Sequence, residues 1–151
     1  MPADSSFASV DHYLGATGQN LLPTGGISTF TKSWDMTVGG TGGANIIGTG
    51  FTPGYRFAIL AIAGIVTTPS TGSGGTQVIT CEISTVATTG GVLTTTLAGT
   101  ATAGVVVNGT AVTALNIGSA TDTLQIVVLT GGTVYTAGVM DLVITIQNLD
   151  A

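Results

Sequence analysis

The sequence predicts an all-β fold: a single-domain antiparallel β-sandwich, jelly-roll-like and of about eight strands, preceded by an extended N-terminal arm. Only 6% of the 151 residues are charged, against about 25% in an ordinary globular domain. Glu and Lys, which cover the solvent side of most helices, each occur once. Thr and Val, which favour strands, are abundant, and 24 glycines supply turns. Strands joined by turns are therefore expected, with very little helix.

Residues 1–28 form the predicted arm, and residues 29–151 form the predicted β-sandwich domain. The arm contains prolines, short Ser and Gly clusters and no sustained periodicity, which is typical of an extended or irregular segment. Its apolar residues are too many for an inert tail: Phe7, Val10, Tyr13, Leu14, Leu21 and Leu22. We therefore expect the arm to dock on a neighbouring subunit or on a larger partner.

The first two strands of the domain are predicted from their hydrophobic patterns. Phe30–Val38 alternates with a period of two, which is typical of a half-buried strand. The glycine-rich segment 39–54 is predicted to be a loop with a short apolar island. Tyr55–Val66 is apolar on both faces, so we expect burial from both sides, between two layers or between a layer and a subunit. Pro69–Gly75 is then expected to break the chain.

Shorter β-rich runs follow, each bounded by turn residues. The predicted strands are Gln77–Val86, Val92–Leu97, Gly104–Val107, Ala111–Ile117, Thr123–Thr130 and Gly138–Asn148. Cys81 lies on the apolar face of its strand, so we expect this thiol in the core. The last strand alternates throughout and is expected to place Met140, Leu142, Ile144 and Ile146 on one face.

Turn signals separate these strands. Asn108 and Gly109 form the strongest two-residue hairpin signal, because a type I′ turn needs positive φ at both central residues. Gly131 and Gly132 form the second strongest. No helical pattern lies between the strands, which argues against a parallel α/β fold. The sequence leaves open whether the connections make a simple sandwich or a jelly roll.

Charge excludes several classes of function. The net charge is −5, and Lys32 and Arg56 are the only basic residues, so nucleic-acid binding is not expected. The most apolar run, Phe57–Val66, is about half the roughly 20 residues of a membrane helix, and the N-terminus lacks the pattern of a secretory signal. The single cysteine, Cys81, cannot form an intrachain disulfide, which fits a protein made in a reducing cytoplasm.

The residues needed for chemistry are also missing. The only histidine, His12, lies in the arm, and Glu82 is the only glutamate, so we predict no catalytic residues and no enzyme. One Cys and one His cannot form a structural zinc site, although a calcium ion shared between subunits stays open. The glycine-rich segment 39–50 lacks the Gly-x-x-x-x-Gly-Lys-Ser/Thr arrangement of a phosphate-binding loop and any helix to follow it, so no cofactor is expected.

The remaining candidates are interface residues. Lys32 and Trp34 share a strand face, either as a cation near an indole at an interface rim or as a core Trp beside an ordinary Lys. Arg56 is a candidate to pair across an interface with one of three acids, Asp35, Asp122 or Asp141. The predicted interface residues are Phe7, Val10, His12, Tyr13, Leu14, Lys32, Trp34 and Arg56.

Residues 86–148, from VATTGGVLTTTLAGTATAG to LQIVVLTGGTVYTAGVMDLVITIQ, together with the arm, resemble the capsid cement or decoration proteins of tailed bacteriophages. This resemblance implies a β-sandwich or jelly-roll trimer. The trimer would be made in the host cytoplasm, bind the major capsid protein on the outer surface of the virion, and stabilise the expanded head. Neither nucleic acid nor membrane is an expected partner.

Two other functions stay open at this point. The first is a receptor- or glycan-binding module of a phage tail or fibre, which would present surface aromatic side chains near carboxylates and amides. The second is a hydrolase, which would have to use Glu82 or His12. Aromatic residues make up only 5% of the chain, which favours the capsid protein over the glycan-binding module.

Overall fold

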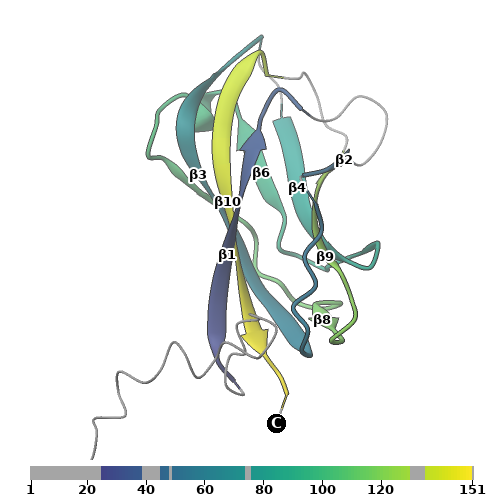
Figure 1. The fold of residues 1–151 in the computed structure, drawn as a ribbon. Helices are drawn as coiled ribbons and strands as arrows, with labels where there is room; N and C mark the ends of the chain where they lie inside the picture. The colour runs from purple at the N-terminus through teal and green to yellow at the C-terminus, as the bar shows by residue number, and fades with distance from the viewer. Residues whose placement is uncertain (1–24, 39–44, 48, 74–75, 130–134, 151) are drawn as a thin grey trace, which may run out of the picture.

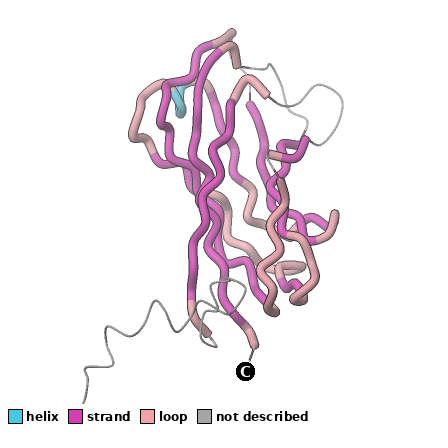
Figure 2. Tube along the Cα trace, viewed as in Figure 1, coloured by secondary structure: helices cyan, strands magenta, loops and turns pink. Residues whose placement is uncertain are grey.

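Antiparallel strands make up most of the described chain. The computed structural model describes residues 25–38, 45–47, 49–73, 76–129 and 135–150. The strands in these ranges are β1 (Ile27–Asp35), β2 (Asn45–Ile46), β3 (Phe57–Thr71), β4 (Thr76–Ile83), β5 (Val86–Ala87), β6 (Leu93–Thr96), β7 (Val106–Asn108), β8 (Ile117–Gly118), β9 (Leu124–Leu129) and β10 (Ala137–Asn148). The only helix in the same ranges is the 3-10 turn η1 (Ala98–Thr100), the short cyan segment in Figure 2. The predicted all-β class is confirmed.

The strands pair in a nested order along the chain. β1 pairs with β10, β2 with β9, β3 with β7 and β8, and β4 with β5 and β6, always antiparallel. This is the pattern of one long hairpin folded over on itself, which also brings β10 beside β3 and β9 beside β4. Two sheets result, with the orders β1-β10-β3-β7 and β2-β9-β4-β5, and they pack on each other (Figure 1).

This connectivity is that of a jelly roll. β5 and β6 share one edge of β4, and β7 and β8 share one edge of β3, so the strands of the described residues fill eight positions. The predicted antiparallel sandwich of about eight strands is therefore confirmed, and the jelly roll is the form it takes.

The core lies between the two sheets and is centred on β10. Its inward residues Met140, Leu142, Ile144 and Ile146 are at most 1% exposed, as the alternating pattern predicts. The opposite sheet supplies inward residues from β4 and β9, namely Ile79, Cys81, Ile83, Leu124, Ile126 and Val128. The predicted core position of Cys81 is confirmed.

β3 is longer than the sequence predicts and passes through a proline. The predicted break at Pro69 is wrong, because the strand continues to Thr71. The ladder between β3 and β10 changes register at this point, with Thr68 opposite Val139 and Thr71 opposite Ala137. Pro69 falls within this irregularity, where a missing N–H does not interrupt a regular ladder.

The outward face of β3 is open in the described chain. Its inward residues Phe57, Ile59 and Ile62 are buried, whereas Leu60 is 38% exposed and Ile65 is 39% exposed. The prediction that two layers of this chain bury both faces of the strand is wrong. Burial of the outward face against another subunit stays a prediction.

The tightest hairpin turn lies at Ser84 and Thr85. Ile83 pairs with Val86, so these two residues form the whole loop between β4 and β5. Their φ angles are 47° and 78°, the positive values of a type I′ turn. The predicted strand Gln77–Val86 is therefore interrupted near its end, at residues with no Gly or Asn to announce a turn.

The hairpin predicted at Asn108 and Gly109 is wrong. Asn108 pairs with Ala63 of β3, and Gly109 donates its N–H to the Ile62 carbonyl at 2.9 Å. The chain therefore continues along β3 at this point and does not reverse. The predicted strand Ala111–Ile117 is also wrong over most of its length, which is irregular except for an isolated bridge and the first residue of β8.

Two short segments, residues 45–46 and 25–28, also differ from the prediction. The segment predicted to be a loop contains β2, because Asn45 and Ile46 pair with β9. At the start of the domain Gly25 donates its N–H to the Asn148 carbonyl at 2.8 Å, and β1 begins at Ile27, within the predicted arm. The turn predicted at residues 131–132 lies outside the described residues.

Replacing Leu142 by Ala tests the importance of the β10 core face. This side chain is fully buried, so its truncation should lower the free energy of unfolding by about 2–5 kcal/mol. Urea denaturation measures the change. Val143→Ala is the matched control because Val143 is the next residue and faces outward. Equal losses in the two variants would contradict the assigned faces.

Replacing Thr85 by Gly tests the turn. A β-branched residue is strained at positive φ and glycine is not, so this variant should be more stable by about 1 kcal/mol. The same substitution at Thr94, an exposed residue of β6, should destabilise the protein because glycine weakens a regular strand. A loss of stability in Thr85→Gly, measured as a lower urea midpoint, would show that the turn has another conformation.

Candidate interaction surface

Two of the predicted interface residues, Trp34 and Lys32, lie on β1 and differ in burial. Trp34 is only 2% exposed, and its Nε1 donates to the Val38 carbonyl at 2.9 Å. Its assignment to an interface is therefore wrong, and it is a core residue. Lys32 lies on the same face of the strand and is half-buried, two residues from Trp34.

Lys32 lies on an edge strand and affects whether that edge can pair with another sheet. β1 forms one edge of its sheet, since only β10 pairs with it in the described residues. A charged side chain on the inward face of an edge strand discourages pairing with the edge of another sheet. Strand-to-strand addition along β1 is therefore disfavoured.

Arg56 lies directly before β3, at the end of the sandwich where the described chain starts and stops. Its backbone N–H donates to Asp150 Oδ2 at 3.1 Å, and its backbone carbonyl accepts from Leu149 N at 2.8 Å. In the described residues none of the three acids predicted to pair with it contacts its guanidinium. Pairing with an acid of another copy stays a prediction, and the arm candidates Phe7, Val10, His12, Tyr13 and Leu14 lie outside the described residues.

Cys81 is the only cysteine of the chain, and it lies in the core. Burial raises the pKa of the Cys81 thiol to about 12, so it stays protonated and unreactive. Within the described ranges no group of three His, Cys, Asp or Glu side chains lies close enough to hold a metal ion. None of the helical structure in these ranges is long and apolar enough to span a membrane.

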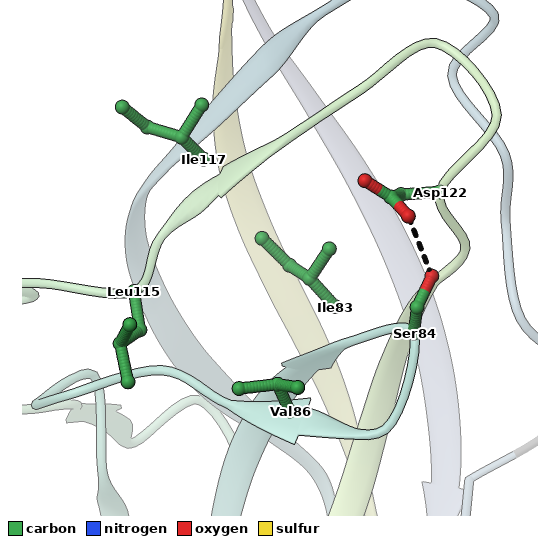
Figure 3. A pocket seen from close by; sticks show the side chains of 6 residues that line it. All are labelled: Ile83, Ser84, Val86, Leu115, Ile117 and Asp122. Atoms are coloured by element: carbon green, nitrogen blue, oxygen red, sulfur yellow. Dashed lines mark hydrogen bonds between the residues drawn. The ribbon is translucent and has the colours of Figure 1, made fainter.

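A surface pocket lies between the β4–β5 hairpin of one sheet and the segment around β8 at the edge of the other. Figure 3 shows its lining: Ile83, Ser84 and Val86 come from the β4–β5 hairpin, and Leu115, Ile117 and Asp122 come from the segment around β8. Its volume is about 290 Å³. Four aliphatic side chains therefore form its wall, and one carboxylate beside one hydroxyl forms its polar side.

The wall of this pocket is held firmly by hydrogen bonds. Asn116 accepts from Ile59 N at 2.8 Å through its carbonyl and donates from Nδ2 to the Ile59 carbonyl at 2.9 Å. On one side of this clamp Ala114 bridges to Thr89, and on the other side β8 pairs with β3. The residue between the bridge and the clamp is Leu115, which is 62% exposed.

Asp122 keeps its negative charge on the pocket rim. Its carboxylate accepts from Ser119 N at 2.7 Å and from Ser84 Oγ at 2.8 Å. The backbone hydrogen bond from Ser119, with the side-chain bond from Ser84 next in importance, holds the pKa of this group below its usual value of 3.8. Among the described residues no lysine or arginine forms an ion pair with this carboxylate, although Arg56 directly precedes Phe57, the partner of Gly118 in β8.

No protein-family model matches the chain, and neither the curated proteins nor the solved structures include a significantly similar one. The function therefore has to be argued from the fold and the surface.

Sequence reasoning missed this pocket. Val86, Leu115 and Ile117 were hidden in segments predicted as regular strands, where alternate residues face the core by default. The usable signal was Asn116, a polar residue between two large aliphatic ones just before Gly118. Such a residue interrupts a strand and commonly binds the backbone locally.

The pH dependence of stability tests the Asp122 contacts. Because the pKa of this group is lowered in the folded protein, its stabilising effect is present above pH 3.8 and is lost as the pH falls through the folded value. Asp122→Asn should therefore lose less stability than the wild type between pH 6 and pH 2, measured as the urea midpoint.

Ser84→Ala provides the comparison for this experiment. It keeps the carboxylate of Asp122 and removes one of its donors, so its pH dependence should fall between those of the wild type and Asp122→Asn. Identical pH profiles for all three proteins would contradict the role of this group.

Proposed function

We propose that the protein is a virion structural protein, a capsid decoration protein that binds the outer surface of the major capsid shell as a homotrimer. Its action would be physical. A subunit bound across the junctions between shell proteins adds contacts that must break before the shell opens, so it stabilises the head against internal pressure. No catalytic step is involved.

The outward face of the β1-β10-β3-β7 sheet is the observation on which this proposal rests. One row across it runs from Ser33 through Asp141 and Ile65 to Val106, so its four residues include one acid and no base. Ile65 is 39% exposed and Val106 is 54% exposed. The face is partly apolar and carries two carboxylates, Asp35 and Asp141, and no base. Contact with copies of the same chain would therefore desolvate few charges.

The neighbouring row has the same character. It runs from Thr31 through Val143 and Ala63 to Asn108, and it contains no charged residue. Self-association through this face agrees with the edge protection by Lys32, which favours packing by faces over pairing by edges. A closed symmetric oligomer would bury the face and leave no open site for further growth.

The start of the described chain indicates how the arm would act. Gly25 donates its N–H to the Asn148 carbonyl, so the described chain starts beside the last residue of β10. Fully extended, the preceding 24 residues could span at most about 80 Å. Three such arms on one trimer would bind neighbouring shell proteins together, and their linkage raises the effective concentration of each.

The alternative function, a receptor- or glycan-binding module of a tail or fibre, has less support. Glycan sites commonly use exposed aromatic rings. Among the aromatic side chains of the described residues only Phe51 is exposed, at 37%, and its ring packs on Phe30 with centroids 5.2 Å apart.

Deleting residues 1–24 tests the proposed function. The deletion stops before Gly25 so that its bond to Asn148 is kept. The truncated protein should remain a folded trimer but bind expanded phage shells that lack this protein at least tenfold more weakly, because multivalent attachment is lost. Light scattering measures the mass, and co-sedimentation with the shells measures the binding.

The function, the trimer and the role of the arm can each fail separately in this experiment. A wild-type protein that does not bind such shells would overturn the proposed function. A monomeric wild type would overturn the trimer, and unchanged shell binding after the deletion would overturn the role of the arm.

A further inference from the structure

Backbone strain in the described chain is concentrated at one place. The non-glycine residues with positive φ in these ranges are Ser84, Thr85 and Leu115, at 47°, 78° and 52°. Ser84 and Leu115 line the pocket described above, and Thr85 lies between two of its lining residues. Strained residues persist where the surrounding structure over-determines them, and they cluster at functional sites.

The same pocket collects exposed aliphatic side chains. Leu115 is 62% exposed, Ile117 55% and Val86 53%, and they surround Ile83, which is only 6% exposed (Figure 3). Single exposed apolar residues are normal on a protein surface. Here three of them lie around one hollow: Leu115 and Ile117 flank Asn116, which is bonded to Ile59, and Val86 pairs with Ile83. Together they form an apolar slot. At its positive φ, Leu115 would be replaced with less backbone strain by Asn or Gly, so the choice of leucine is not explained by the stability of the fold.

The charge at the slot indicates what kind of partner fits it. Asp122 places a carboxylate beside the aliphatic wall, and its pKa is lowered by Ser119 and Ser84. A second copy of this chain could offer only Lys32 or Arg56 to this carboxylate, because it contains no other basic residue. A partner of different sequence, with a basic residue beside a large apolar one, satisfies both the wall and the carboxylate.

The slot also lies near the start of the arm. Gly118 pairs with Phe57, Phe57 pairs with Asn148, and the Asn148 carbonyl accepts from Gly25 N. Three strand spacings therefore separate β8 from residue 25, which is about 14 Å. A protein that the arm binds next to the sandwich would thus also reach the slot.

We propose that this slot, formed by Ile83, Val86, Leu115, Ile117 and Asp122, is a docking site for one large apolar side chain next to a Lys or Arg on the shell protein. The inference rests on the proposed function and adds the surface and the chemistry of the contact. The volume of about 290 Å³ lies at the lower limit for ligand pockets, about 300–1,000 Å³, and suits a single side chain better than an extended ligand.

Leu115→Asn tests the slot without endangering the fold. Asparagine tolerates the left-handed conformation better than leucine, so the variant keeps the backbone and loses the apolar side chain. Val38→Asn is the matched control, since Val38 is 56% exposed and lies beyond the other end of β1. Urea denaturation and light scattering establish that both variants keep the stability and mass of the wild type.

Co-sedimentation with expanded phage shells that lack this protein gives the readout. Leu115→Asn should bind about tenfold more weakly or worse, as expected for an apolar anchor in a pocket, and Val38→Asn should bind within twofold of the wild type. Asp122→Asn should also weaken binding and reduce its salt dependence, because one ionic contact is lost.

Each other outcome overturns a stated part. If the wild type binds shells and Leu115→Asn binds equally well, the slot assignment is wrong while the proposed function stands. If Leu115→Asn instead lowers the oligomer mass, a second copy occupies the slot and the assignment to the shell protein is wrong. If the wild type binds no shell, the proposed function and the docking partner fail together.

Discussion

The position of β10 is the constraint on which the rest of the structure depends. The last strand of the chain lies between β1 and β3, and its ladder with β1 runs from Ile27 opposite Gln147 to Asp35 opposite Val139. This sheet is therefore complete only when β1 and β10, the first and last strands of the described chain, have paired. All other pairs nest within this one, so the core between the sheets, the clamp at Asn116 and the pocket all depend on contacts between residues far apart in sequence. Such non-local pairing is slow to form because loop closure precedes the stabilising contacts.

The parts of this fold that the sequence predicts are those determined by local alternation. β1, β4, β9 and β10 each have one face in the core, and a period of two is enough to place their buried residues. Turns were predicted less well because pairing partners outside the turn decide them. Ser84 adopts positive φ where its hydroxyl donates a hydrogen bond to Asp122, whereas Gly109 donates its N–H to the Ile62 carbonyl of β3. A turn prediction from two adjacent residues takes no account of Asp122 or Ile62, which lie far away in the sequence.

The candidate site shows the same limit. For Trp34 the sequence leaves open an interface rim and a core position beside Lys32, and only the enclosing sandwich decides for the core. The residues that do form an exposed apolar hollow, Val86 and Leu115 among them, come from different sheets and meet only through the nested pairing. Hydrophobic pattern alone assigns such residues to the core, because it cannot distinguish a side chain that faces the other sheet from one that stands beyond the sheet edge.

The scarcity of charge takes on a specific meaning once the strands are placed. The single lysine protects the longest free edge, and the single arginine lies at the end of the sandwich from which the arm starts. The opposite arrangement, with charges spread over the faces, would keep the subunits apart. The outward sheet face carries two carboxylates and no base, and under the proposed function it would contact copies of the same chain, whereas the slot beside Asp122 would contact the shell protein. Because the two surfaces differ in shape and in the side chains they present, each would select a different partner under the proposed function.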